Sequence, residues 1–153
     1  MGRIFVSGTL ALFFVCLASI VSNAQAATVG SWSKTCVAPN WMTGAPVVVP
    51  DTNVNDPSSP FWGFTSRQPG GNWLTQYNVA KISGPMATRA VLIFLFFHEC
   101  AHAQFNSADE GIADCRGLEA LRRDMPVTDS MIQEITAAYA SVGRPFPSAP
   151  CSF

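Results

Sequence analysis

The sequence has few charged residues and no surplus of either sign. Charged residues are 12% of the 153 residues, and the formal net charge is −1. That share is about half of what soluble domains usually carry. Without a basic surplus the chain lacks the electrostatic footprint of a nucleic-acid-binding protein. The sequence also has no internal repeat and no low-complexity tract, so a single domain with one core is the expected organisation.

The first 26 residues have the composition of a secretory signal peptide. Arg3 precedes an apolar stretch that is densest over residues 10–21, and small residues follow it. A basic start, a short apolar middle and a small-residue end favour export followed by cleavage. Ala24-Gln25-Ala26 fits cleavage before Ala27, and cleavage before Gln25 is the alternative.

We therefore predict a signal peptide at residues 1–26 and one domain at residues 27–153, exported to the periplasm or secreted. An uncleaved membrane anchor is the rival interpretation. The dense apolar segment is shorter than the ~20 residues that a membrane-spanning helix needs. After cleavage we expect no stable membrane span.

The chain has five cysteines, and Cys16 would leave with the signal peptide. An even number in an exported domain predicts two disulfides, formed among Cys36, Cys100, Cys115 and Cys151. Their spacing leaves the pairing open. If the helices that carry Cys100 and Cys115 pack together, a bond between these two would leave Cys36 to join Cys151.

Short strands are predicted in the first half of the domain. Residues 46–50 are a β-branched run between two prolines, which favours a strand at a sheet edge. Residues 73–79 are also strand-forming and are expected to pair with that run. Turn residues predominate elsewhere, so we expect residues 27–45 to be mostly irregular, with a short strand near Trp41, and residues 51–71 to form a long loop or a loose hairpin.

An aromatic cluster, Phe61-Trp62-Gly63-Phe64, lies in the middle of this long loop. Long loops in compact domains are often functional, so the cluster either lines a substrate cleft or closes over one. The alternative is that it folds back and covers the small core. The sequence does not decide between them.

A long helix is predicted from about Pro85 to about Phe105, with Ser83 as its N-cap. Its second half is apolar on every side, which indicates a helix buried at the centre of the domain. A buried strand is the rival interpretation for residues 91–97. Helix is favoured because no helix-breaking residue separates this run from the segment that follows.

Two further helices are expected. One spans about residues 108–124, with Ser107 and Glu110 as a capping box. The other spans about residues 129–142, with Thr128 or Ser130 as its cap and Gly143 at its end. The expected fold class is therefore α+β: short N-terminal antiparallel strands, then about three helices, of which the first is buried at the centre.

Both histidines of the chain lie in His98-Glu99-Cys100-Ala101-His102, at the end of the apolar helix. Residues four apart lie on the same face of a helix, so the two imidazoles can bind one metal ion. This is the H-E-x-x-H pattern, in which two histidines bind zinc and the glutamate activates the metal-bound water. It predicts Zn²⁺ held by His98 and His102, with Glu99 as the catalytic general base.

A catalytic zinc ion usually has three protein ligands, and the second predicted helix offers carboxylates. Glu110 and Asp114 are four apart and share a face. If a tight turn at 106–107 lets the helices run antiparallel, Glu110 would bind the metal and Asp114 would hold a ligand histidine. Alternatively Glu110 only caps its helix and Asp109 is the ligand, or Asp114 is a solvated side chain.

His98-Glu99-x-x-His102 followed by Glu110-x-x-x-Asp114 resembles the gluzincin metallopeptidases, the thermolysin-like group. With Ala113-Asp114-Cys115, it is also similar to small exported proteins of the metallopeptidase type. The resemblance covers about residues 85–125. It implies a zincin-like domain with His98, His102 and Glu110 as zinc ligands, Glu99 as general base and Asp114 as the partner of a ligand histidine.

The expected function is zinc-dependent hydrolysis of peptide bonds in a peptide or protein substrate. The oxyanion would be stabilised by the metal or by one of Tyr77, Tyr139 and Arg67. The strand at 46–50, being at an edge, would align an extended substrate. The alternatives are a non-catalytic zinc-binding or interaction domain on the same scaffold, and a membrane-anchored structural protein whose histidines belong to the core.

Overall fold

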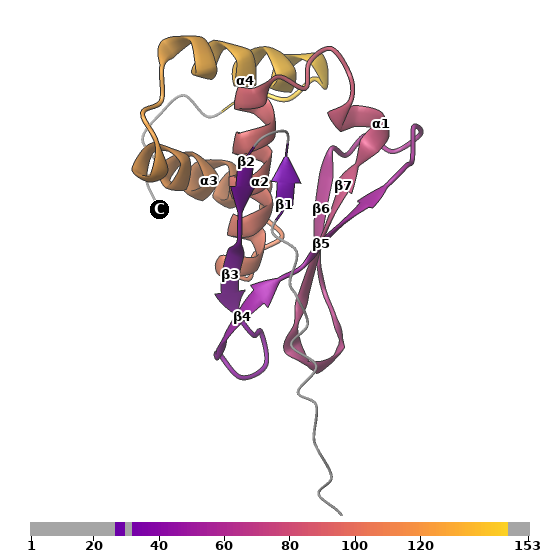
Figure 1. Ribbon diagram of the computed structural model, residues 1–153, viewed down its shortest axis with the longest axis vertical. Coiled ribbons are helices and arrows are strands. Elements are labelled where there is room, and N and C mark those ends of the chain that lie inside the picture. The colour runs from indigo at the N-terminus through magenta and orange to yellow at the C-terminus, as the bar shows by residue number, and fades with distance from the viewer. Residues whose placement is uncertain (1–26, 30–31, 147–153) are drawn as a thin grey trace, which may run out of the picture.

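The computed structural model describes residues 27–29 and 32–146, and it has α+β architecture (Figure 1). The strands are β1 (Ala27–Val29), β2 (Trp32–Lys34), β3 (Cys36–Pro39), β4 (Pro46–Val49), β5 (Asp51–Val54), β6 (Gly63–Arg67) and β7 (Trp73–Asn78). The helices are the 3-10 helix η1 (Pro69–Gly71) and the α-helices α1 (Val79–Ile82), α2 (Arg89–Gln104), α3 (Glu110–Asp124) and α4 (Asp129–Ser141). The predicted signal peptide lies outside the described residues. Within them, no helix combines the length and the apolar character that a membrane span requires.

The strands form two hairpins and one mixed sheet. β1 pairs with β2, and β3 pairs with β4, both antiparallel. In the third sheet the order is β5-β7-β6, with β5 parallel and β6 antiparallel to β7. β6 is therefore an edge strand in the described part of the chain.

The predicted strand at 46–50 is present as β4, and the predicted strand at 73–79 is present as β7, but β4 and β7 do not form the expected strand pair; the two segments meet where the Thr75 amide donates to the Pro50 carbonyl. β4 pairs with β3, in a segment that we expected to be irregular. The expected loop at 51–71 contains β5 and β6, which flank β7 on either side. These short strands are stabilised by pairing with a neighbouring strand more than by their own composition, so local composition did not reveal them. Trp41 lies in the turn between β3 and β4 and not in a strand.

α2 is the central element, as its apolar sequence predicted. Strands lie on one side of it and α3 and α4 on the other (Figure 1). Its buried residues occupy every face of the helix: Ala90, Val91, Ile93, Phe94, Phe96, Phe97, His98, Glu99, Cys100, Ala101, His102 and Ala103. The metal-binding pattern is thus part of the core and not of the surface.

Two predicted helix starts are wrong by a few residues. Ser83 ends α1, because its amide N–H donates to the Val79 carbonyl, and α2 is instead capped by Thr88. α3 is capped by the Asp109 carboxylate, which accepts from the Ile112 amide, so the capping box of Ser107 with Glu110 does not form. The third predicted helix is present as α4 with its Thr128 cap.

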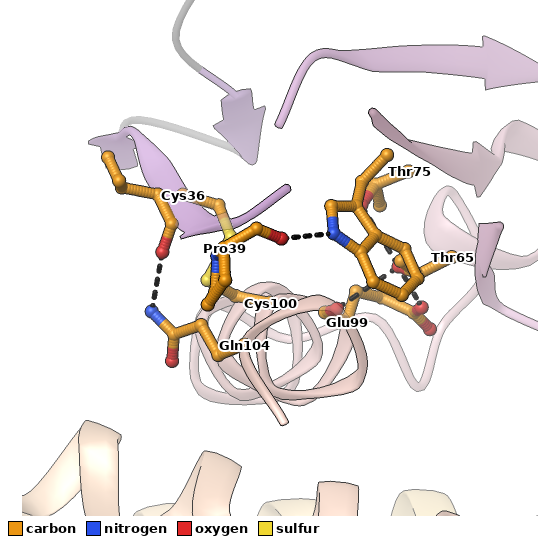
Figure 2. The surroundings of a disulfide bond; sticks show 9 residues. Cys36, Pro39, Thr65, Thr75, Glu99, Cys100 and Gln104 are labelled. Atoms are coloured by element: carbon orange, nitrogen blue, oxygen red, sulfur yellow. Dashed lines mark hydrogen bonds between the residues drawn. A yellow bond between two sulfur atoms is a disulfide. The ribbon is translucent and has the colours of Figure 1, made fainter. Parts of the chain in front are cut away.

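A disulfide joins β3 to the middle of α2 (Figure 2). It links Cys36 to Cys100, so the predicted pairs Cys100–Cys115 and Cys36–Cys151 are wrong. Cys115 is disulfide-bonded as well, and Cys151 lies outside the described residues. Cys36 and Cys100 are paired because β3 packs directly on α2. The spacing of the cysteines in the sequence does not reveal this packing.

Candidate metal centre

The two histidines of α2 direct their Nε2 atoms at the same point. These atoms are 3.1 Å apart, on side chains one helical turn from each other. Nδ1 of His102 lies 2.7 Å from the Ser107 carbonyl oxygen, which can only accept a hydrogen bond. His102 therefore keeps its proton on Nδ1, and its Nε2 lone pair is available to a metal ion.

Glu110, the first residue of α3, brings its carboxylate to the same point. Its Oε2 lies 3.2 Å from Nε2 of His98, and its Oε1 lies 3.7 Å from Nε2 of His102. Ligand atoms about 2.0–2.1 Å from a tetrahedral zinc ion stand about 3.3 Å from one another. The three donors lie close to that spacing, so His98, His102 and Glu110 form a group that could hold a metal ion.

Asp114, one turn further along α3, holds the other nitrogen of His98. Its Oδ1 is 2.7 Å from Nδ1 of His98 and also accepts a hydrogen bond from the Tyr139 hydroxyl of α4. A carboxylate accepts the Nδ1 proton, which leaves Nε2 of His98 directed at Glu110 and His102. Asp114 is 3% exposed, so it is not the solvated side chain of the alternative prediction.

Arg144 lies just beyond α4 and pairs with both carboxylates of α3. Its Nη1 is 3.0 Å from Oε2 of Glu110, and its Nη2 is 3.2 Å from Oδ2 of Asp114. Its guanidinium also packs over the Tyr139 ring at 5.2 Å. Arg144 therefore bridges the carboxylates of Glu110 and Asp114 and offsets part of their negative charge.

The cluster favours a positive charge at its centre. Burial alone would lower the pKa of His98, but hydrogen bonds to Asp114 and Glu110 raise it from 6.5 to about 9. The hydrogen bond to His98 in turn lowers the pKa of Glu110 to about 2. Either a proton or a divalent cation supplies this positive charge, and a site that favours positive charge is electrostatically suited to a metal ion.

α3 reaches the histidines because it lies unusually close to α2. A Cβ on Gly117 would stand 2.9 Å from the backbone nitrogen of His98. The connection runs from Phe105 to Asp109, longer than the turn at 106–107 that we expected, and Figure 1 shows α3 crossing α2 rather than running antiparallel beside it. A glycine at the crossing allows the two backbones to approach closely enough for Glu110 to reach the histidines.

Glu99 lies on α2 beside the ligands and faces β6. Its Oε2 accepts a hydrogen bond of 2.8 Å from the Thr65 hydroxyl, and a Cβ on Gly63 would stand 2.5 Å from its Oε1. Burial raises the pKa of the Glu99 carboxyl, partly offset by the charge of His98 and by Thr65. A carboxylate whose pKa is shifted toward neutrality is suited to proton transfer.

A cavity of about 640 Å³ opens over this cluster. Its polar floor includes His98, Glu99, His102 and Glu110. Its walls are largely apolar and include Phe61, Trp62, Phe64, Trp73, Val91, Phe94, Leu95, Tyr139 and Val142. The aromatic cluster thus lines this cavity, and its Trp62 also packs against the core. The size is typical of a site for a small molecule or a few peptide residues.

Other predicted residues lie elsewhere or have other contacts. Asp109 caps α3 and is not in the metal group. Tyr77 is a buried residue of β7 and does not line the large cavity, whereas Tyr139 and Arg67 do. Residues 46–50 do not line it either.

Two residues of the site were missed. Nothing in the local sequence marks Thr65, which comes to Glu99 only through the sheet. Arg144 follows Gly143, whose φ of 73° ends α4 and turns the chain back toward α3. A basic residue directly after a predicted helix-ending glycine was the only signal available for it.

Comparisons with protein-family models, with curated proteins and with solved structures find no match to this chain. Fold class alone does not determine function. The functional argument therefore depends on the geometry and chemistry of the cluster and its cavity.

Proposed function

We propose that this protein is an exported zinc-dependent peptidase of the gluzincin type that uses Glu99 as its general base. One observation carries the proposal. Two imidazole nitrogens and a carboxylate converge at a spacing that suits one metal ion, next to a buried glutamate and under a cavity.

Zinc is the metal that this donor set favours. Two neutral imidazoles and one carboxylate, with a fourth position left open, are the usual ligands of a catalytic zinc ion. His98, His102 and Glu110 would hold it. When bound, zinc supplies a Lewis acid that polarises a carbonyl and lowers the pKa of water.

Glu99 provides the proton transfers that hydrolysis of an amide needs. Thr65 donates to Oε2, which leaves Oε1 to accept a proton from the attacking water. Water oxygen then bonds to the carbonyl carbon, the carbon–nitrogen bond breaks, and Glu99 returns the proton to the leaving amine. The products are a carboxylic acid and an amine.

The free edge of β6 offers a way to align the substrate. All five residues of β6 line the cavity, and β7 is its only strand partner in the described residues. An extended peptide could add to this edge through main-chain hydrogen bonds. The role that we expected for residues 46–50 thus passes to residues 63–67.

The disulfide supports the export part of the proposal. The Cys36–Cys100 bond is consistent with an oxidising compartment outside the cytosol. Residues 1–26, the predicted signal peptide, would direct the chain there.

Metal analysis and peptide digestion test the proposal together. The purified protein should contain about one zinc ion per chain, and His98→Ala should lose it. On a mixed peptide library Glu99→Gln should bind zinc like the wild type but cleave roughly 100- to 10,000-fold more slowly. Glu119→Gln, a matched change on the exposed side of α3, should keep both properties.

Two results would contradict the proposal at different points. Zinc binding without cleavage by the wild type, or cleavage that Glu99→Gln leaves unchanged, would reduce the site to a non-catalytic metal centre. An unchanged zinc content in His98→Ala would show that this cluster is not the zinc site.

A further inference from the structure

Arg67, the last residue of β6, lines the same cavity as the metal cluster. Its Nε and Nη2 donate to Oδ1 of Asn106, at 3.0 and 2.6 Å. Its guanidinium also lies over two indole rings, 5.6 Å from that of Trp41 and 5.9 Å from that of Trp73. Residues from three separate segments therefore position this one cation.

These partners of Arg67 are uncharged: one side-chain amide and two aromatic rings. The other arginine of the cavity, Arg144, is paired with the carboxylates of Glu110 and Asp114. Arg67 forms no ion pair with an acidic side chain of the described residues in the structure. Among the described residues, no acidic side chain thus compensates the positive charge of Arg67 at its end of the cavity.

The guanidinium is held in place by groups that are themselves fixed. The Trp73 indole N–H donates to the Pro39 carbonyl at 2.8 Å, and the Trp41 indole N–H donates to the Asn72 carbonyl at 3.1 Å. Asn106 has a φ of 48°, a left-handed conformation that directs the chain away from the end of α2. A fixed guanidinium fork loses little entropy when it binds a planar anion.

The register of β6 sets the distance from Arg67 to the general base. Gly63, Thr65 and Arg67 alternate along the strand and so face the same side, toward α2. Thr65 donates to Glu99, and Arg67 is two residues, or about 7 Å, further along the strand. A peptide that runs along the β6 edge with its reacting carbonyl at Glu99 would place a group one or two residues away beside Arg67.

We propose that Arg67 is a specificity-determining residue that binds a carboxylate of the peptide substrate, within about two residues of the bond that is cleaved. The carboxylate is either the C-terminus of the peptide or an acidic side chain. The inference rests on the proposed peptidase function, which supplies the substrate and its alignment. Arginine donates several N–H groups in one plane, and those not directed at Asn106 remain for the anion.

The kinetic test uses peptides that differ in one carboxylate at a time. One series has a free-acid or an amidated C-terminus at increasing distance from the cleaved bond, and the other has Glu or Gln at each internal position. At one position of the carboxylate relative to the cleaved bond, the wild-type KM should be roughly 10- to 100-fold lower for the peptide with the carboxylate than for the peptide without it. Arg67→Gln should remove that difference with little change in kcat, and the exposed Arg122→Gln should preserve it.

The series that shows the effect identifies the source of the carboxylate. A preference for the free C-terminus would identify the enzyme as a carboxypeptidase or as a peptidase that releases short C-terminal fragments. Preference for an internal Glu makes it an endopeptidase that selects acidic residues. Equal KM values for both members of every pair, or a preference that Arg67→Gln retains, would overturn the proposal.

A binding measurement separates this inference from the proposed function. Zinc-loaded Glu99→Gln protein is titrated with the same peptides while tryptophan fluorescence is recorded, because Trp41 and Trp73 flank the guanidinium. Carboxylate-dependent quenching that is lost in the Glu99→Gln, Arg67→Gln double variant supports the anion site even if the wild type cleaves nothing. Cleavage with no carboxylate dependence supports the peptidase and rejects the anion site.

Arg67 also links β6 to the end of α2, so its removal could disturb the fold. Arg67→Lys keeps the charge but not the planar fork, and it should retain an intermediate preference. If Arg67→Gln lowers the unfolding temperature and Arg67→Lys keeps that temperature but shows no carboxylate preference at all, the side chain is a structural link and the proposal fails.

Discussion

At the scale of single residues, each imidazole of the candidate metal centre is fixed through its second nitrogen. His98 donates from Nδ1 to the Asp114 carboxylate, and His102 donates from Nδ1 to the Ser107 carbonyl. These acceptors set the ring orientation and leave Nε2 for the metal. The Asp114 carboxylate can be replaced by mutation, whereas the Ser107 carbonyl belongs to the backbone and cannot.

Asp114→Asn should therefore weaken zinc binding without abolishing it. The amide lacks the negative charge that His98 and Arg144 contact, and only its oxygen can accept a hydrogen bond, because its NH₂ group is a donor. We expect the zinc affinity to fall roughly 10- to 100-fold, measured by competition with a fluorescent chelator. Glu119→Gln is the matched control, and equal affinities in the two variants would show that Asp114 does not orient His98.

At the scale of elements, the metal group depends on how closely α3 crosses α2. His98 and His102 lie on one helix and Glu110 on the next, and the helices meet at Gly117. Because both backbones are part of the core, an added methyl group there has no free volume to occupy. The distance between the helices, more than the loop between them, determines whether Glu110 reaches the histidines.

Gly117→Ala should test this dependence. Alanine favours helix over glycine by about 1 kcal/mol, so α3 alone would gain stability. The clash with the His98 backbone should outweigh that gain, lower the unfolding temperature and weaken zinc binding. Gly111→Ala is the matched control on the exposed first turn of α3, where the new Cβ meets only the Asp109 side chain at 3.1 Å. Calorimetry and zinc titration on both variants would contradict the idea if Gly117→Ala were as stable and as tight-binding as the wild type.

At the scale of the whole molecule, a bound metal would add a further link between α2 and α3, which are otherwise held by packing and by the contacts of His98 with Asp114 and Glu110. The disulfide already fastens β3 to α2 on the opposite side (Figure 2). The metal ligands are assembled only in the folded chain, so zinc should stabilise the native state by mass action.

Removal of zinc should accordingly lower the unfolding temperature. At a free zinc concentration about 100 times Kd, the stabilisation is about 2.7 kcal/mol, which for a domain of this size corresponds to roughly 10 °C. Differential scanning calorimetry with zinc and with EDTA measures the shift. His98→Ala should show no shift, and an equal shift in that variant would place the stabilising zinc elsewhere.

Much of the site could be predicted from local sequence. The apolar run that ends in His98 and His102 predicted a buried helix, and helical spacing placed both imidazoles on one face. The same spacing put Glu110 and Asp114 together on the next helix. These predictions succeeded because a helix depends on contacts three or four residues apart, which the sequence displays directly.

Predictions that needed contacts between separate elements were less successful. β6 lies in a segment expected to be a long loop or a loose hairpin, because a short strand is stabilised by its partner β7 and not by its own composition. The cysteine pairing was wrong for the same reason, since it required knowing that β3 packs on α2. Thr65 and Arg144 became visible only when separate elements were brought around Glu99 and Glu110.

The sequence by itself determined which side chains share a helix: two imidazoles and a carboxylate on one buried helix, followed by two carboxylates on one face of the next. Only the tertiary structure decided which carboxylate joins the histidines, which strand edge borders them and where the charge of Arg67 lies. The physical reason is the range of the interactions. Helical periodicity fixes neighbours within a turn, whereas the approach at Gly117 and the edge position of β6 follow from the packing of the whole core.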